Sequence, residues 1–301
     1  MECYPYPIDL HMHTTVSDGT DTPQEILAHV KEAGIALFSV TDHDAVKAGR
    51  QILSIRTQDD PLFITGAEFS CKDEEGKYHI LGYGFDPDAP SVSRLVAAGH
   101  GYRIKKVMAR LEFLKTEFGF SFPQQELDQL MAMDNPGKPH IANLMVKYGF
   151  ADSKEQAIKQ FINQIRFRSE YVRPEEAIAG ILGGGGVPVL AHGPYGSGDE
   201  LIIGEELDQR IRRLMEFGLR GVEAYYSGFT DKLRRMMLTL AQTYDLYVTA
   251  GSDYHGRNKL VELGDTGLPP AEEYPEGLRR FLNELLRRMP AGQYRKEEES
   301  V

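Results

Sequence analysis

The hydrophobic and polar positions of the first 90 residues alternate between short apolar runs and helical patterns. Between the first two runs, Thr22, Pro23 and Glu25 take the N-cap, first and third positions of a helix, which is a capping-box arrangement. Apolar residues then recur at helical spacing until Gly34 ends the helix. The apolar runs predict strands over residues 8–11, 37–41, 62–65 and 78–83.

Residues 91–173 carry a helical pattern with no convincing strand, and helices are predicted over 95–118, 124–131, 139–147 and 153–163. The first of these helices has Lys and Arg on one side. Its other side is an apolar stripe that we expect to pack in a core: Ile104, Val107, Met108, Leu111 and Leu114. After Pro174 the alternation resumes, with strands predicted over 187–190, 221–224 and 247–250 and helices over 205–217 and 230–244.

Strands separated by helices favour a parallel sheet or barrel. The pattern therefore predicts an α/β fold in which residues 1–90 and 174–290 form a discontinuous barrel domain. Residues 91–173 form an inserted all-helical subdomain, and the charged segment 291–301, which ends in RKEEESV, is expected to be a frayed tail.

Composition narrows the class of protein. With 301 residues, 41% of them hydrophobic and 26% charged, the chain can bury a large core. No apolar run approaches the ~20 residues that span a bilayer, and the first residues lack the basic region and apolar core of a signal peptide. Two cysteines, Cys3 and Cys71, are too few for a disulfide framework or a cysteine zinc site. We expect a cytoplasmic protein with no membrane partner.

The net charge of −11 argues against electrostatic binding of duplex nucleic acid over a large basic surface. It does not exclude a small anionic substrate, because bound cations dominate the local field of a metal site. Recognition of an anion must then come from metal ions and a few basic side chains.

Histidines and carboxylates collect at the carboxyl ends of the predicted strands. In a parallel α/β barrel the strand ends converge on one rim, where the chemistry of such folds takes place. His79 is different, because it falls within a predicted strand. The residues that follow strands are His11, His13, His43, Glu68, His192, Asp253 and His255.

The stretch from Asp9 to Gly19, DLHMHTTVSDG, carries the clearest pattern. On an extended strand His11 and His13 point the same way, and Asp18 follows after a turn. Two imidazoles and a carboxylate suit a divalent transition metal, although a strand with two solvent-facing histidines is the alternative. Across the chain six histidines and three carboxylates could act as ligands. Because one tetrahedral zinc takes about four ligands, this set suits two or three metal ions that share a bridging carboxylate.

These residues stand in segments that resemble the PHP (polymerase and histidinol phosphatase) superfamily of metal-dependent phosphoesterases: DLHMHTTVSDG, VTDHD, GAEFS, YHILGYG, LAHGP and GSDYHG. The insertion carries GKPHIAN, which is similar to a segment of the subgroup that includes nucleoside 3′,5′-bisphosphate phosphatases. The resemblance implies a distorted (β/α)7 TIM-like barrel, the PHP fold, whose helical insertion caps the active site. It also implies two or three divalent ions, Mn, Fe or Zn.

The resemblance also implies a role for each ligand. One metal would be held by His11, His13, Glu68 and Asp253, and a second by Asp18, His43 and His255. His79 and His192, with Glu68 bridging, would hold a third ion or contact substrate. The residues expected to be catalytic are Asp18, His43, Glu68, His192 and Asp253. Two positions depart from the subgroup, which often has Arg in place of Lys138 and proline in place of Gly193.

The implied reaction is hydrolysis of a phosphate monoester by in-line attack of a metal-bound hydroxide, with no covalent enzyme intermediate. The expected substrate is a small phosphorylated metabolite, a nucleoside 3′,5′-bisphosphate that loses its 3′-phosphate. Short single-stranded oligonucleotides are a related substrate.

A second phosphate needs cationic partners away from the metals. Lys138 and His140 open a predicted helix, whose backbone N–H groups favour anions. Further candidates are Arg257 and the run Arg103, Lys105 and Lys106, for which a solvated helix face is the alternative. Asp9, Asp42 and Asp44 could orient ligating imidazoles or serve only in turn hydrogen bonds.

Two other functions stay open. A histidinol-phosphate phosphatase is the nearest enzymatic rival, and the helical insertion with GKPH favours the bisphosphate instead. A metal-binding sensor or partner module without turnover belongs to a different class. Such a module is expected to have lost ligands, whereas every expected position is filled here.

Overall fold

Two sheets form the centre of the computed structural model, which describes residues 4–166, 170–197 and 200–288. The first sheet is parallel and contains β1 (Ile8–Asp9), β2 (Leu37–Phe38) and β3 (Leu62–Phe63). The second contains, in this order, β4 (Gly66–Lys72), β5 (Lys77–Tyr83), β6 (Val187–Leu190), β7 (Gly221–Tyr226) and β8 (Tyr247–Gly251). The fold class is therefore mixed α/β, as the alternating pattern predicted.

The parallel arrangement expected for the whole barrel is wrong at β4, β5 and β6. β5 pairs antiparallel with both β4 and β6, whereas β6, β7 and β8 are parallel. The turn between β4 and β5 is too short for a parallel crossover, which needs about a dozen residues, so a hairpin forms. β4 was not predicted as a strand. Glu68 thus lies within β4 and not in a loop after β3, which corrects the sequence-based placement.

The strand ladders do not close into the expected seven-unit barrel. Isolated contacts join the two sheets: Leu10 N donates to Ala250 O (2.9 Å), and single parallel bridges pair Met12 with Tyr254 and His43 with Glu68. β1, β2 and β3 are two residues long each, because the chain leaves the sheet at once for the loops that carry polar side chains.

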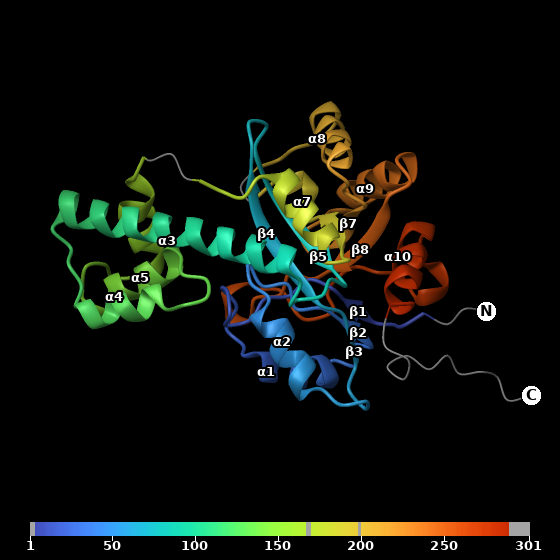
Figure 1. Cartoon of the computed structure of the whole chain (residues 1–301), viewed down its shortest axis with the longest axis horizontal. Helices are drawn as coiled ribbons and strands as arrows, with labels where there is room; N and C mark the ends of the chain where they lie inside the picture. Colours follow the sequence, from blue (N-terminus) through green and yellow to red (C-terminus); the bar gives the residue numbers. More distant parts are fainter. Residues whose placement is uncertain (1–3, 167–169, 198–199, 289–301) are drawn as a thin grey trace, which may run out of the picture.

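Helices cover both sheets (Figure 1). α1 (Pro23–Glu32) and α2 (Lys47–Ile55) lie beside β1–β3, and α10 (Glu276–Leu286) packs on β8. α7 (Pro174–Gly183), α8 (Glu205–Glu216) and α9 (Asp231–Thr243) lie on the other side of the molecule. The capping box of α1 is confirmed, since Thr22 N donates to Glu25 Oε2 at 2.7 Å and Glu25 N donates to Thr22 Oγ1 at 3.3 Å.

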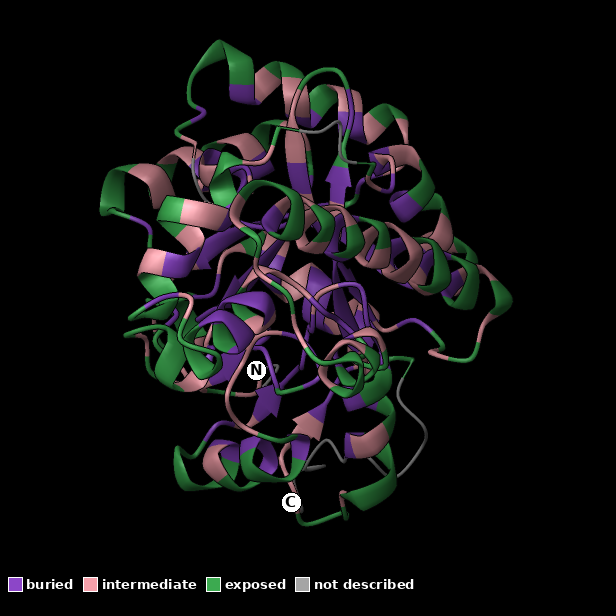
Figure 2. Cartoon of the chain, turned by 90° about the vertical axis from the view of Figure 1, so that its left-hand side faces the viewer, coloured by how far each residue is buried: buried purple, intermediate pink, exposed green. Residues whose placement is uncertain are grey.

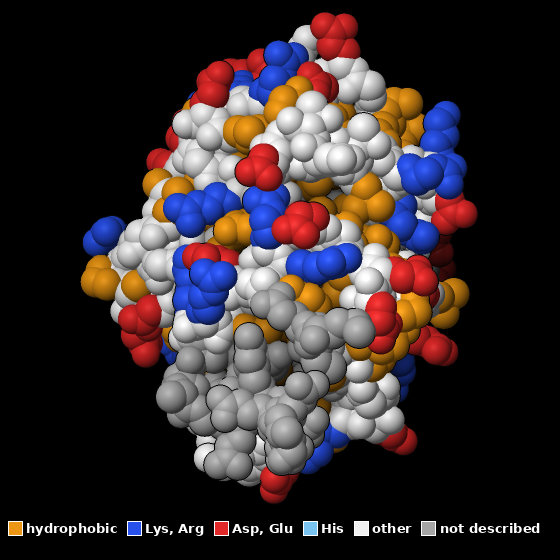
Figure 3. All heavy atoms as spheres, turned by 90° about the vertical axis from the view of Figure 1, so that its right-hand side faces the viewer, with side chains coloured by type: hydrophobic (Ala, Val, Ile, Leu, Met, Phe, Trp, Pro, Cys, Tyr) orange, Lys and Arg blue, Asp and Glu red, His pale blue; other side chains and the backbone are white. Residues whose placement is uncertain are grey.

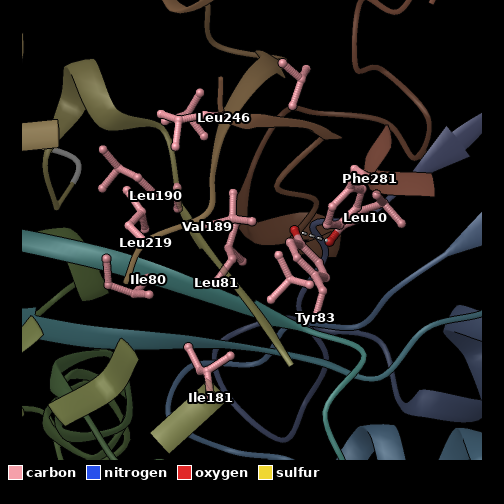
Figure 4. Packing of buried hydrophobic residues seen from close by; sticks show 14 of the residues in the cluster. Leu10, Ile80, Leu81, Tyr83, Ile181, Val189, Leu190, Leu219, Leu246 and Phe281 are labelled. Atoms are coloured by element: carbon pink, nitrogen blue, oxygen red, sulfur yellow. Dashed lines mark hydrogen bonds between the residues drawn. The ribbon is translucent and has the colours of Figure 1, made fainter. Parts of the chain in front are cut away.

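The main core fills the space between the second sheet and its helices, and the strands are buried almost throughout (Figure 2). Figure 4 shows Leu81 and Val189 packed at its centre, with Ile181 of α7 below the strands. Tyr83 contacts Phe281 of α10 with ring centroids 5.5 Å apart, and its hydroxyl donates to Leu10 O at 2.9 Å. The hydrogen bond from Tyr83 to Leu10 joins β5 of the second sheet to the residue that follows β1 of the first sheet.

Residues 90–164 form helices that extend to the left in Figure 1: α3 (Pro90–Phe118), α4 (Gln124–Met131), α5 (Lys138–Lys147) and α6 (Lys154–Gln156). One π-helical turn and one 3-10 turn follow α6, so the predicted helix over 153–163 is broken. A second cluster of buried residues holds this part together, among them Val107, Leu114, Ile141 and Met145. Met108 was expected in the core, but its side chain is 57% exposed because it lies to one side of the stripe.

None of the described helices combines the length and the apolar character needed to cross a bilayer. On the face that carries α10, acidic and basic side chains are interspersed among the described residues (Figure 3). The predicted tail, 291–301, lies outside the described residues.

Candidate metal centre

All nine side chains expected to bind metal converge in one place. They come from the loop after β1, the loop after β2, β4, β5, and the chain after β6 and after β8. Neighbouring imidazole rings have centroids 4.1 Å apart for His13 and His255, 4.6 Å for His13 and His43, and 5.2 Å for His79 and His192. The group is His11, His13, Asp18, His43, Glu68, His79, His192, Asp253 and His255, which we call the histidine–carboxylate cluster.

Glu68 lies at the centre of the cluster and is buried. Its Oε1 lies 2.9 Å from His79 Nδ1 and 3.1 Å from His192 Nε2. Its Oε2 lies 3.0 Å from His43 Nδ1 and 3.3 Å from His13 Nε2. The two oxygens thus face different pairs of imidazoles, which is the arrangement expected of a carboxylate that bridges two ions.

Asp253 and Asp18 complete the cluster on opposite sides of His13. Asp253 Oδ1 lies 3.4 Å from His13 Nε2 and 3.5 Å from His11 Nε2. Asp18 Oδ1 lies 3.5 Å from His13 Nδ1 and 3.4 Å from His255 Nε2. The Asp18 side chain is 36% exposed, so this side of the cluster is the one open to solvent.

The local backbone brings these groups together. A Cβ on Gly251 would lie 2.1 Å from His11 Cβ, so only glycine lets the end of β8 approach β1 this closely. His192 and Asp253 have φ angles of 27° and 59°, a conformation that few non-glycine residues adopt. A strained backbone conformation of this kind persists only where many surrounding contacts hold it in place, and such conformations are concentrated at functional sites.

The cluster fits divalent metal ions. Three overlapping sets have ligand atoms within 4.8 Å of one another: His13, Asp18, His43 and His255; His11, His13 and Asp253; and His43, Glu68 and His79. Within the described chain, buried His11 Nε2, His13 Nε2 and His43 Nδ1 lie near carboxylate oxygens, but none of them forms a hydrogen bond of acceptable geometry. Leaving such atoms unpaired costs about 1–3 kcal/mol each, and metal coordination would satisfy them. Imidazole with carboxylate is a donor set for Zn, Fe and Mn.

The charges of the cluster shift the pKa values of its members. Burial opposes ionisation of Glu68, but the neighbouring imidazoles outweigh it and hold the pKa well below the usual range. Burial likewise disfavours the imidazolium of His13, yet contacts with Asp253 and Glu68 raise its pKa to about 9. His79 behaves oppositely, since burial lowers its pKa to about 4. His79 therefore offers a neutral ring at neutral pH, whereas His13 holds a proton.

Metal binding is therefore expected to release protons above neutral pH. Without metal, the raised pKa of His13, about 9, keeps its ring protonated at pH 7.5, and only the deprotonated ring can act as a ligand. Mn²⁺ affinity should then rise with pH until about pH 9, not level off near the ordinary histidine pKa of about 6.5. Calorimetric titration with Mn²⁺ at pH 7.5, in buffers of different ionisation enthalpy, measures the protons released. Binding without proton release would contradict this assignment.

Glu223 supports the cluster from behind, and the sequence analysis missed it. It is fully buried on β7, where its Oε1 lies 2.9 Å from His11 Nδ1 and its Oε2 accepts from His192 N at 2.9 Å. Of the aspartates proposed to orient ligands, Asp42 accepts from Ser17 Oγ (2.6 Å) beside His13, and Asp9 accepts from Ser252 N (3.0 Å). A glutamate inside a strand, without a motif around it, gives no signal in a single sequence.

Glu223→Gln is expected to weaken Mn²⁺ binding by about 10–100-fold, because an outer carboxylate fixes the tautomer and orientation of a ligating imidazole. The glutamine keeps the shape but presents an N–H₂ group to His11 Nδ1 or His192 N. Competition with a metal-sensitive dye measures the affinity. The matched control is Glu216→Gln, an exposed position on α8, and equal Mn²⁺ affinity for the two variants would rule out this role.

A cavity of about 270 Å³ opens from the cluster, where Asp18, His43 and His79 line it. Arg103 of α3 and the pair Lys138 and His140 of α5 line it as well, so these three proposed substrate-binding residues meet at one site. Arg257 is not part of the lining, and its backbone N donates to Thr20 Oγ1 at 3.0 Å. Lys77 and Arg110 line the cavity without having been proposed from the sequence.

Comparison with known proteins identifies relatives of this chain. A family model described as the PHP domain matches residues 9–168. A 5′-3′ exoribonuclease of Haemophilus influenzae is 27% identical over 266 residues, which cover 85% of this chain and 92% of the relative. A 3′,5′-nucleoside bisphosphate phosphatase of Chromobacterium violaceum is 26% identical over 289 residues, which cover 92% and 96%. The crystal structure of a candidate metal-dependent phosphoesterase from Bifidobacterium adolescentis is 27% identical, with a TM-score of 0.74, over 93% of this chain and 98% of that one.

Proposed function

The chain belongs to the PHP domain family and is a metal-dependent phosphoesterase, and we propose that it removes the 3′-phosphate from nucleoside 3′,5′-bisphosphates. The observation that carries the proposal is the position of the histidine–carboxylate cluster at one end of a cavity that also holds basic side chains. The relative from Chromobacterium violaceum, which matches nearly the whole chain, supports this substrate class.

We propose that the nine residues of the cluster hold two or three Mn, Fe or Zn ions. When bound, such ions make water acidic enough to attack at neutral pH and neutralise phosphoryl charge in the transition state. Glu68 holds the imidazoles around it in place, since its two oxygens face different sets of rings. Asp18, His43, His192 and Asp253 complete the proposed catalytic group.

His140 is placed to donate a hydrogen bond to substrate. Its Nδ1 accepts from Gly137 N at 3.1 Å, so the neutral ring carries its proton on Nε2. Burial lowers the pKa of His140, which keeps the ring neutral. Because His140 lines the cavity, Nε2–H can bind a phosphoryl oxygen without competing for a proton. We further propose that α3 and α5, the helices of Arg103 and His140, cap the site.

We propose that the isolated bonds between the two sheets make them a distorted form of the (β/α)7 barrel. A cytoplasmic location is supported by the buried free thiol of Cys71, which suits a reducing compartment. Both proposals concern the setting of the site, and neither changes its chemistry.

A phosphate-release panel with added Mn²⁺ tests the substrate assignment. The panel contains adenosine 3′,5′-bisphosphate, adenosine 5′-monophosphate, histidinol phosphate and a short 5′-phosphorylated RNA. We expect the highest kcat/KM for the bisphosphate, with adenosine 5′-monophosphate as the product. Faster turnover of histidinol phosphate by a wide margin would make the assignment wrong. Binding of Mn²⁺ without any turnover would favour the sensor alternative.

Short RNA trimmed from its 5′ end is a second candidate substrate. It is favoured by the relative named as a 5′-3′ exoribonuclease, which is as similar to this chain as the phosphatase is. Because cleavage of RNA into mononucleotides releases no inorganic phosphate, chromatography of the same reactions detects it, and a kcat/KM above that for the bisphosphate would favour this substrate.

A further inference from the structure

Four cationic side chains line the cavity on the side of α3 and β5: Lys77, Arg103, Lys106 and Arg110. Three of them follow one another on α3 at spacings of three and four residues, which places them on one face of the helix. Lys77 is the first residue of β5, and the neighbouring strand β4 contacts α3 through the hydrogen bond from Arg103 to Ser70. We call this group the cationic end of the cavity.

Few carboxylates lie near the cationic end to balance its positive charge. Arg103 Nε donates to Asp44 Oδ2 at 2.7 Å, and its Nη2 donates to Ser70 Oγ at 3.0 Å. In the described part of the chain, neither Lys77 nor Lys106 has a carboxylate within ion-pair distance. Lys106 is only 9% exposed, and its Nζ lies 3.3 Å from the centre of the Tyr171 ring.

This arrangement is unfavourable in the absence of an anion. Like charges three or four residues apart destabilise a helix, and a buried ammonium without a paired carboxylate loses hydration. Burial lowers the pKa of Lys106 to about 7. The charge of Arg103 acts in the same direction, and the charge of Asp44 opposes it without cancelling the shift. The neighbouring Lys105 shows the ordinary alternative, since it is exposed and paired with Glu170 at 2.6 Å.

The cationic end begins close to the histidine–carboxylate cluster. Lys77 and His79 are two residues apart on one face of β5, which separates their Cα atoms by about 7 Å. Ser70, which accepts from Arg103, is paired directly with His79 in the ladder of β4 and β5. A ligand that contacts both ends therefore needs two anionic groups separated by little more than a sugar ring.

We propose that the cationic end binds a second phosphomonoester of the substrate, the one that is not hydrolysed, with Lys106 and Lys77 as its principal contacts. This inference rests on the proposed function and specifies its substrate class: compounds with two phosphoryl groups joined by a short spacer such as a ribose. A phosphoryl dianion supplies the charge that the described carboxylates do not, and the cavity volume of about 270 Å³ is near the lower bound of ligand pockets, about 300 Å³.

Binding of adenosine 5′-monophosphate to the metal-free protein tests this site apart from catalysis. Removing the metal ions removes their attraction for the phosphate, so the effect of each lysine substitution reports on the cationic end. Calorimetry should show that Lys106→Met and Lys77→Met each weaken binding by about tenfold or more, which is the effect of losing one charged hydrogen bond. Lys105→Met, one residue along the same helix, is the matched control and should bind as the unmodified protein does. Adenosine, which lacks the phosphate, should not bind measurably.

Lys77→Met and Lys106→Met lie on different elements, so one result survives if the other variant does not fold. Unchanged affinity for adenosine 5′-monophosphate in both folded variants would overturn the proposal, as would equal losses in Lys105→Met. A 5′-phosphorylated dinucleotide and its 5′-hydroxyl form distinguish a mononucleotide from an oligonucleotide source of the same phosphate. If the lysine variants lose binding but the intact protein does not hydrolyse the bisphosphate, the cationic site stands and the 3′-phosphatase proposal falls.

Discussion

Glu68→Gln is expected to lower kcat/KM for phosphate-ester hydrolysis by about 10³-fold, which corresponds to about 4 kcal/mol of lost transition-state stabilisation. The carboxylate faces five imidazoles, at distances from 2.9 Å for His79 to 3.5 Å for His11. Glutamine keeps the size but removes the negative charge, and it presents N–H₂ to rings that already have protons to donate. We expect the variant to bind fewer metal ions per chain as well.

Elemental analysis of the purified variant and steady-state kinetics with saturating Mn²⁺ measure these two effects. Glu216→Gln, at an exposed position, controls for the change of residue type. Glu68→Asp keeps the charge and should recover part of the metal content. Near-normal turnover by Glu68→Gln would remove the carboxylate from the centre of the mechanism.

Asp253→Asn is expected to reduce kcat/KM by at least about 10²-fold. One oxygen of Asp253 faces His11 and His13, while the other accepts from Tyr226 Oη at 3.0 Å and from Lys259 Nζ. Burial disfavours the carboxylate, but the imidazoles outweigh it and hold its pKa well below the usual range. Asparagine is neutral and tolerates the left-handed backbone of this position, so the substitution removes charge without adding strain.

A second aspartate in the left-handed region offers a matched control for Asp253. Asp245 has a φ angle of 53°, and its side chain is 88% exposed. It precedes β8, whereas Asp253 follows the other end of that strand. Asp245→Asn should therefore keep its activity within about twofold, because surface substitutions cost little. Comparable activity losses in the two variants would assign the effect of Asp253→Asn to the backbone rather than to the site.

The histidine–carboxylate cluster could be foreseen because its residues follow strands that the hydrophobic pattern reveals. His11, His192 and Asp253 come directly after apolar runs, and parallel strands bring such positions to one rim. His79 and Glu68 obey a different rule, since both lie inside strands of an antiparallel hairpin. His79 was found through its motif, whereas Glu68 was singled out as following the predicted strand 62–65, although it lies inside β4.

The residues around the cluster could not be found in this way. Glu223 stands in a strand without a motif, and its role depends on a contact with His11, which is 212 positions away. Lys77 and Arg110 look like ordinary surface charges in the sequence. Only the tertiary fold, in which Arg103 of α3 donates to Ser70 of β4, brings them to one cavity. Contacts between residues far apart in the sequence leave no local pattern. A glutamate in a strand or a lysine at a strand end looks the same whether or not it lines a site.

The errors in the fold have related causes. β4 was missed because GAEFSCK is buried on both faces and shows no alternation of apolar and polar residues. Met108 was placed in the core from helical spacing alone, although α3 presents only part of its apolar stripe to the second cluster. A pattern shows which face of a helix is apolar, but the neighbours decide how wide the buried stripe becomes.

Anomalous diffraction from crystals grown with Mn²⁺ tests the central claim most directly, because it locates the ions. We expect two or three peaks within the histidine–carboxylate cluster, each about 2.0–2.3 Å from imidazole nitrogen or carboxylate oxygen, with Glu68 between two of them. Peaks only outside the nine side chains, or none in crystals of protein that binds Mn²⁺ in solution, would contradict the account.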